Sequence, residues 1–88
     1  MPFPLTSSQL RAARALLRWS AEELAQRSLL SVATIRRAEL TDETTSMTAA
    51  NDLAVRRALE AAGVEFIDEN GGGPGVRLAK SRKDKPRK

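Results

Sequence analysis

Two adjacent arginines, Arg36 and Arg37, stand on a short segment that also carries hydroxyl side chains at Ser31 and Thr34. A guanidinium group is a permanent cation with several N–H donors, so it binds phosphate oxygens or the O6 and N7 atoms of guanine. Hydroxyl groups cap helices and donate to phosphate. These residue types are suited to recognition of a polyanion, although an arginine pair by itself is more typical of a solvated helix face.

This chain lacks most of the residues that usually catalyse reactions or bind metal ions. The 88 residues include no cysteine, histidine or tyrosine. There is thus no disulfide framework or thiolate metal site, and the commonest general base is missing. The glycine-rich run at 71–75 lacks the Lys-Ser/Thr of a P-loop and is better explained as a hairpin turn. We expect no enzyme activity, no cofactor and no metal.

The positive charge is concentrated at the C-terminus. Residues 79–88 hold six basic residues and one acidic residue, whereas residues 1–78 hold nine basic and ten acidic ones. Such a tail suits phosphate binding, although it is also a common solubilising terminus. Apolar runs are too short to span a membrane, and no signal peptide is predicted. We expect a cytoplasmic protein.

Capping signals and apolar spacing predict four helices. Thr6 and Gln9 have capping-box spacing, as do Ser20 and Glu23, and Ser31 caps a third segment. The expected helices cover about 7–18, two turns after Ser20, about 32–40 and about 49–62, with a polar loop at 41–48. Alternating residues at 64–67 and 76–78 predict a β-hairpin.

The predicted fold is mainly α, with four short helices followed by a C-terminal β-hairpin. Its organisation is a helical domain at 1–63, the hairpin at 64–78 and a disordered basic tail at 79–88. The inward residues expected in the helices are Leu10, Ala13, Leu16, Leu17, Leu24, Ala25, Ile35, Val55 and Leu59. Leu53 falls on the polar side of the fourth helix, together with Arg56, Arg57 and Glu60.

The segment 10–40 resembles the Cro/cI-type helix-turn-helix family, also called the XRE family. The residues that carry the resemblance are Arg14, Trp19, Ser20, Glu23, Leu24, Ala25, Ser31, Thr34, Ile35, Arg37 and Glu39. Residues 56–67 and 70–78 look like a C-terminal extension of small bacterial members. The resemblance implies a lambda-repressor-like DNA-binding domain whose third helix enters the major groove.

The resemblance also assigns roles. Val32, Ala33 and Arg37 would face base edges, with Arg37 the best candidate for guanine. Ser31, Thr34 and Arg36 would lie near phosphates or flanking bases.

Three further features concern the frame of the motif. Ser20 would cap a helix whose first amides can hold a phosphate, and Arg14 and Glu39 would form a partly buried ion pair. Two positions depart from the family: Ala21 replaces a phosphate-binding glutamine, and Leu29 replaces the glycine of the turn.

A lone two-stranded hairpin is marginal in water and leaves open edges. We therefore expect a homodimer formed through the hairpin and the fourth helix, with contacts from Leu53, Val64, Phe66 and Ile67. Such a dimer would place two recognition helices about 34 Å apart on a palindromic operator in double-stranded DNA.

The expected function is sequence-specific regulation of transcription, as a repressor. The alternative is a protein-interaction module, such as an antitoxin or an antagonist that captures a partner protein.

Overall fold

Helix α1 (Ser7–Leu17) begins at the predicted capping box. The Thr6 hydroxyl accepts a hydrogen bond from the Gln9 amide at 3.0 Å, and the Gln9 side chain accepts one from the Thr6 amide at 3.0 Å. Two amides at the helix start thus gain partners. The computed structural model describes residues 4–68 and 70–79. The tail predicted at 79–88 therefore lies outside the described residues, apart from Ala79.

Three more helices follow, each after a hydroxyl side chain that accepts from the amide three residues later. They are α2 (Ala21–Ser28), α3 (Val32–Ala38) and α4 (Ala49–Ala61), capped by Ser20, Ser31 and Thr48. The predicted arrangement of four helices is confirmed. The capping box expected at Ser20 is formed on one side only, since the Glu23 carboxylate pairs with Arg27 at 2.7 Å.

Helices α1 and α2 both end in left-handed backbone without glycine. Arg18 has φ 59° and Leu29 has φ 62°. In this conformation the Cβ atom of an L-residue lies too close to the following carbonyl oxygen, which costs roughly 1–2 kcal/mol per residue. Leu29 therefore adopts the strained turn conformation expected where the resembled family has glycine, and its side chain is 90% exposed.

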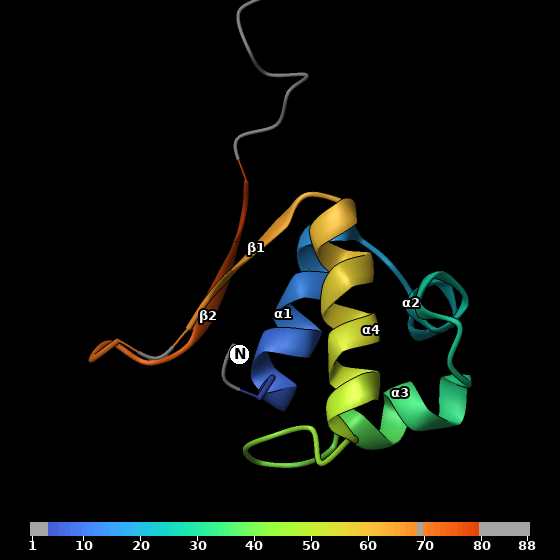
Figure 1. Cartoon of the computed structure of the whole chain (residues 1–88). Coiled ribbons are helices and arrows are strands. Elements are labelled where there is room, and N and C mark those ends of the chain that lie inside the picture. Colours follow the sequence, from blue (N-terminus) through green and yellow to red (C-terminus); the bar gives the residue numbers. More distant parts are fainter. Residues whose placement is uncertain (1–3, 69, 80–88) are drawn as a thin grey trace, which may run out of the picture.

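The hairpin consists of β1 (Val64–Ile67) and β2 (Gly75–Leu78), which are antiparallel as predicted. Val64 lies opposite Leu78 and Ile67 lies opposite Gly75. As Figure 1 shows, the hairpin lies beside α1 and α4, while α2 and α3 occupy the other side of the molecule. None of the described helices is long and apolar enough to cross a membrane.

A single apolar core joins all four helices to the hairpin. Its buried members are Leu5, Leu10, Ala13, Ala21, Leu24, Ala25, Ile35, Ala38, Val55, Leu59, Val64 and Phe66. Leu16 was expected in this set, but it is 39% exposed. It lies about 120° around α1 from Leu10, so it falls at the edge of the buried stripe.

Arg56 does not lie in solvent, contrary to the expectation for α4. Its side chain is 13% exposed, its guanidinium stacks 4.9 Å from the centre of the Phe66 ring, and it pairs with Glu60 and Asp68. The aliphatic stem of an arginine covers apolar surface while the charged end keeps its partners. Arg56 thus links α4 to β1 and covers apolar surface between them.

Val64 and Phe66, two of the residues predicted as dimer contacts, have buried side chains. Val64 is 3% exposed and Phe66 is 8% exposed, because both point into the core of their own chain. The Gln9 side chain also donates hydrogen bonds to the carbonyls of Ile67 (3.3 Å) and Gly75 (3.0 Å). The hairpin is thus supported by α1. Leu53 and Ile67 are half-buried.

Candidate nucleic-acid interface

The turn between α2 and α3 fixes how α3 is presented. Leu24 and Ile35 are fully buried and Ala25 is 5% exposed, so the two helices pack closely around these side chains. The Leu30 amide bonds the Ala25 carbonyl at 2.9 Å, which ends α2 sharply. The buried Ser28 hydroxyl donates to the Leu24 carbonyl at 2.7 Å. As a result, one face of α3 is packed against α2 and the opposite face is exposed.

The free face of α3 follows helical spacing. Ile35 and Ala38 are buried, whereas Ala33, Arg36 and Arg37 are exposed. Leu40, which lies two residues beyond the end of α3, is 81% exposed. Sequence reasoning missed the exposure of Leu40, although its spacing of four from Arg36 and three from Arg37 is a signal for it.

Val32 is less available than the resemblance implies. It is half-buried and packs against the core cluster. Of the three residues expected to face base edges, Ala33 and Arg37 are thus exposed, while Val32 offers only part of its side chain.

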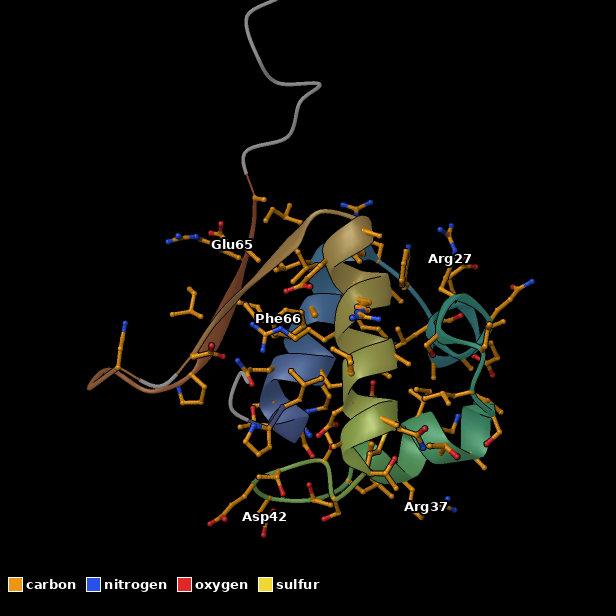
Figure 2. All side chains as sticks on the ribbon, viewed as in Figure 1. Arg27, Arg37, Asp42, Glu65 and Phe66 are labelled. Carbon is orange, nitrogen blue, oxygen red and sulfur yellow. The ribbon has the colours of Figure 1, made fainter. Side chains whose placement is uncertain are left out.

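The two arginines of α3 differ in their partners. Arg36 forms an ion pair with Glu22 of α2. Among the described residues, Arg37 forms no ion pair with any acidic side chain. Figure 2 shows Arg37 projecting from the outer surface of α3, at the end of the molecule where the loop at 41–48 also lies. Arg37 is therefore a cation available to a partner.

A hollow of about 440 Å³ opens beside Arg37, between α3, the following loop and the start of α4. It is lined by Thr34, Arg37, Ala38, Thr41, Thr45, Ser46, Met47, Thr48 and Asn51. Most of these side chains carry a hydroxyl, amide or guanidinium group, so the hollow suits an oxygen-rich ligand. Sequence reasoning missed it because its residues are spread over two helices and a loop.

The predicted hydroxyl contacts are engaged in caps. Ser31 is exposed, and its hydroxyl accepts from the Thr34 amide at 3.1 Å and bonds the Thr34 hydroxyl at 2.9 Å. Ser20 accepts from the Glu23 amide at 3.0 Å. The first turn of α2 also carries the carboxylates of Glu22 and Glu23. These two negative charges already stabilise the positive N-terminal end of the α2 dipole. They therefore repel an anion that approaches Ser20.

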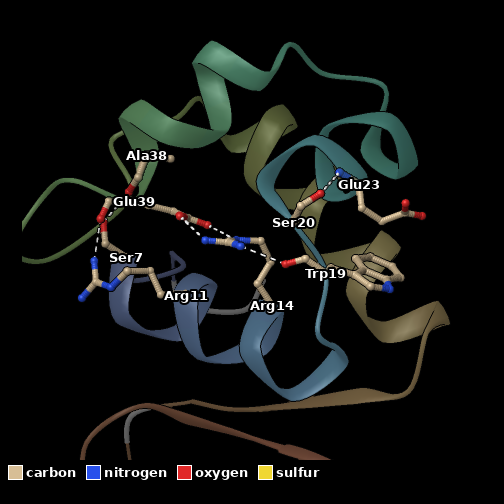
Figure 3. A network of polar contacts seen from close by, with 8 residues as sticks. All are labelled: Ser7, Arg11, Arg14, Trp19, Ser20, Glu23, Ala38 and Glu39. Atoms are coloured by element: carbon tan, nitrogen blue, oxygen red, sulfur yellow. Dashed lines mark hydrogen bonds and ion pairs between the residues drawn. The ribbon is translucent and has the colours of Figure 1, made fainter.

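Arg14 and Glu39 hold the three N-terminal helices together, as Figure 3 shows. Arg14 Nε donates to Glu39 Oε2 at 2.7 Å, and Nη2 donates to Oε1 at 2.8 Å. Arg14 Nη1 donates to the Trp19 carbonyl at 2.8 Å, and Arg11 donates to the Glu39 carbonyl at 2.5 Å. The hydrogen bonds that Arg14 donates to the Glu39 carboxylate raise the pKa of Arg14. This network fixes α1 to the end of α3.

No protein-family model matches the chain, and no curated protein matches its sequence. Within residues 4–68 and 70–79, no group of three acidic side chains could hold a metal ion. The groups that this surface presents are an exposed guanidinium, neighbouring hydroxyls and two small or apolar side chains.

Proposed function

We propose that α2 and α3 form a helix-turn-helix and that the protein is a sequence-specific DNA-binding regulator acting in the cytoplasm. One observation supports this most strongly. Arg37 stands unpaired among the described residues, on the exposed face of a helix whose other face is anchored by α2. A rigid helix that presents a free guanidinium matches what direct readout in the major groove requires.

In this proposal α3 enters the major groove. Arg37 donates to guanine O6 and N7, and Ala33 and Leu40 contact thymine methyl groups. Ser31 and the Ser46 and Thr48 hydroxyls beside the hollow donate to phosphates along the edge of the groove, whereas the Thr41 and Thr45 hydroxyls already donate within the chain. Phosphate contacts set the position of the helix, and Arg37 supplies the sequence preference.

We further propose that two copies bind a palindromic operator and repress transcription. Because the side chains of Val64 and Phe66 are buried, this pairing uses the strand edges and the exposed side chains of the hairpin. The exposed hairpin residue Leu78, which is 51% exposed, and the open strand edges are the features available for pairing. Light scattering at micromolar concentration should report a dimer, and a monomer would contradict this part of the proposal.

The test is enrichment of random duplexes by the purified protein, followed by affinity measurements. Enriched duplexes should contain an inverted repeat. Arg37→Ala should lose roughly 5- to 150-fold in affinity for them, the equivalent of about 1–3 kcal/mol per bidentate base contact. Arg57→Ala is the matched control, since Arg57 is an exposed arginine of α4. Equal losses for the two variants, with both folded by circular dichroism, would reject base recognition by Arg37.

A protein-interaction module is the second candidate, favoured by two exposed leucines. Leu29 is 90% exposed and Leu40 is 81% exposed, and a protein partner that covers such side chains removes apolar surface from water. Failure to enrich any duplex by a folded protein would favour this function. In that case Leu29→Ser and Leu40→Ser should weaken partner binding more than Arg37→Ala.

A further inference from the structure

Glu22 occupies an unusual position for the proposed interface. It lies in the first turn of α2, and its carboxylate pairs with the Arg36 guanidinium of α3. Both side chains remain well exposed, with 61% of Glu22 and 59% of Arg36 accessible. The negative charge of Glu22 also helps to raise the pKa of Arg14, so it acts across the junction of α1, α2 and α3.

The neighbouring Glu23 has the same charge but a different orientation. It pairs with Arg27 at 2.7 Å within α2, and Arg27 stacks 4.8 Å from the Trp19 ring centre. Figure 3 shows Glu23 pointing away from α3, and Figure 2 shows Arg27 far from Arg37. Adjacent glutamates thus face two different surfaces, and only Glu22 borders the exposed face of α3.

The pairing limits what Arg36 can contribute to DNA binding. Phosphate affinity that is independent of sequence comes from cations that replace counterions along the backbone. Arg36 is such a cation, but its charge is matched by Glu22. An exposed pair is weak enough to exchange partners, so a phosphate must displace Glu22 and then lies close to its carboxylate. Arg37, one residue further, has no such competitor among the described residues.

We propose, resting on the proposed function, that Glu22 is a specificity-determining residue for double-stranded DNA. It holds Arg36 back from phosphates and repels the backbone, which suppresses binding to random sequence. Operator binding is reduced less, because the base contacts of Arg37 are unaffected. Specificity thus comes partly from a repulsive element in α2.

The experiment measures affinity for a random duplex and for an enriched duplex as a function of salt. Glu22→Gln should strengthen binding to the random duplex several-fold, up to about tenfold. It should also steepen the slope of log K against log salt by about 0.9 per bound protomer, as expected for one more phosphate contact from each. The ratio of operator to random affinity should fall. Glu23→Gln removes the same charge but should leave the slope unchanged.

A double variant tests whether Arg36 carries the effect. Adding Arg36→Ala to Glu22→Gln should abolish the gain on random DNA. Equal effects of Glu22→Gln and Glu23→Gln, or a gain that survives loss of Arg36, would overturn the inference while leaving the proposed function intact. If the wild-type protein binds neither duplex, the proposed function fails, and the role of Glu22 fails with it.

Discussion

The Arg14 guanidinium and the Glu39 carboxylate face each other in a two-point contact, with N–O distances of 2.7 and 2.8 Å. A third N–H of Arg14 reaches the Trp19 carbonyl. The Arg14 side chain is 25% exposed and that of Glu39 is 10% exposed, so water screens the pair only in part. One guanidinium therefore sets how α1, the start of α2 and the end of α3 sit together, and with them the angle of α3.

Removing this pair should destabilise the fold. Arg14→Gln is expected to lower the free energy of unfolding by roughly 2–3 kcal/mol, because a partly buried carboxylate loses its charged donors. Arg27→Gln removes an exposed partner of Glu23 and should cost less than about 1 kcal/mol. Urea denaturation of both variants measures the two losses in the free energy of unfolding. Similar losses would mean that the Arg14–Glu39 pair is no stronger than a surface pair.

The hairpin should depend on Gln9. Gln9→Ala leaves the carbonyls of Ile67 and Gly75 without their side-chain donor, and it also removes half of the Thr6 capping box. We expect a loss of roughly 1–3 kcal/mol and faster hydrogen exchange in β1 and β2. Ser8→Ala, at an exposed position of the same helix, is the control. Unchanged exchange in the strands of Gln9→Ala would show that the hairpin is held by apolar packing alone.

Replacing the strained turn residue should stabilise the protein. Leu29→Gly relieves the left-handed strain and loses little packing, because the leucine side chain is 90% exposed. Glycine also raises the conformational entropy of the unfolded chain, which offsets part of this gain. A net increase of about 0.5–1 kcal/mol in the free energy of unfolding is expected. Leu40→Gly is the matched control: Leu40 is also exposed but lacks positive φ, so glycine should be neutral or harmful there. A loss of stability in Leu29→Gly would indicate that the leucine side chain has a packing role.

Local signals in the sequence account for much of this fold. Hydroxyl caps at Thr6, Ser20 and Ser31 act over three residues, so they locate the starts of α1, α2 and α3 from the sequence alone, and the polar loop at 41–48 locates the start of α4. Gly63, with φ 109°, marks the end of α4 in the same local way. Such features need no knowledge of the tertiary fold.

Features that depend on distant partners could not be predicted. Val64 and Phe66 alternate as a strand should, but their pattern does not say whether the apolar face covers its own chain or another. Arg56 looks like a surface residue until Phe66 and Asp68 meet it across the turn after α4. The pairing of Glu22 with Arg36 depends on the crossing of α2 and α3, which local spacing does not fix.

The stability of the protein should respond to the charge of Asp52. This side chain is buried in the first turn of α4, and burial raises the pKa of its carboxyl although the Thr45 hydroxyl donates to it at 2.6 Å. An acid whose pKa is higher in the folded state stabilises the fold when protonated, and this contribution is lost as the pH rises through the folded pKa.

Asp52→Asn keeps a carbonyl for Thr45 without the charge. Its stability relative to wild type should therefore increase as the pH rises from the ordinary pKa of an aspartate, about 4, toward neutrality. Thermal unfolding across this range measures the difference, with the exposed Asp42→Asn as control; a relative stability that stays constant or decreases over the range would contradict the raised pKa.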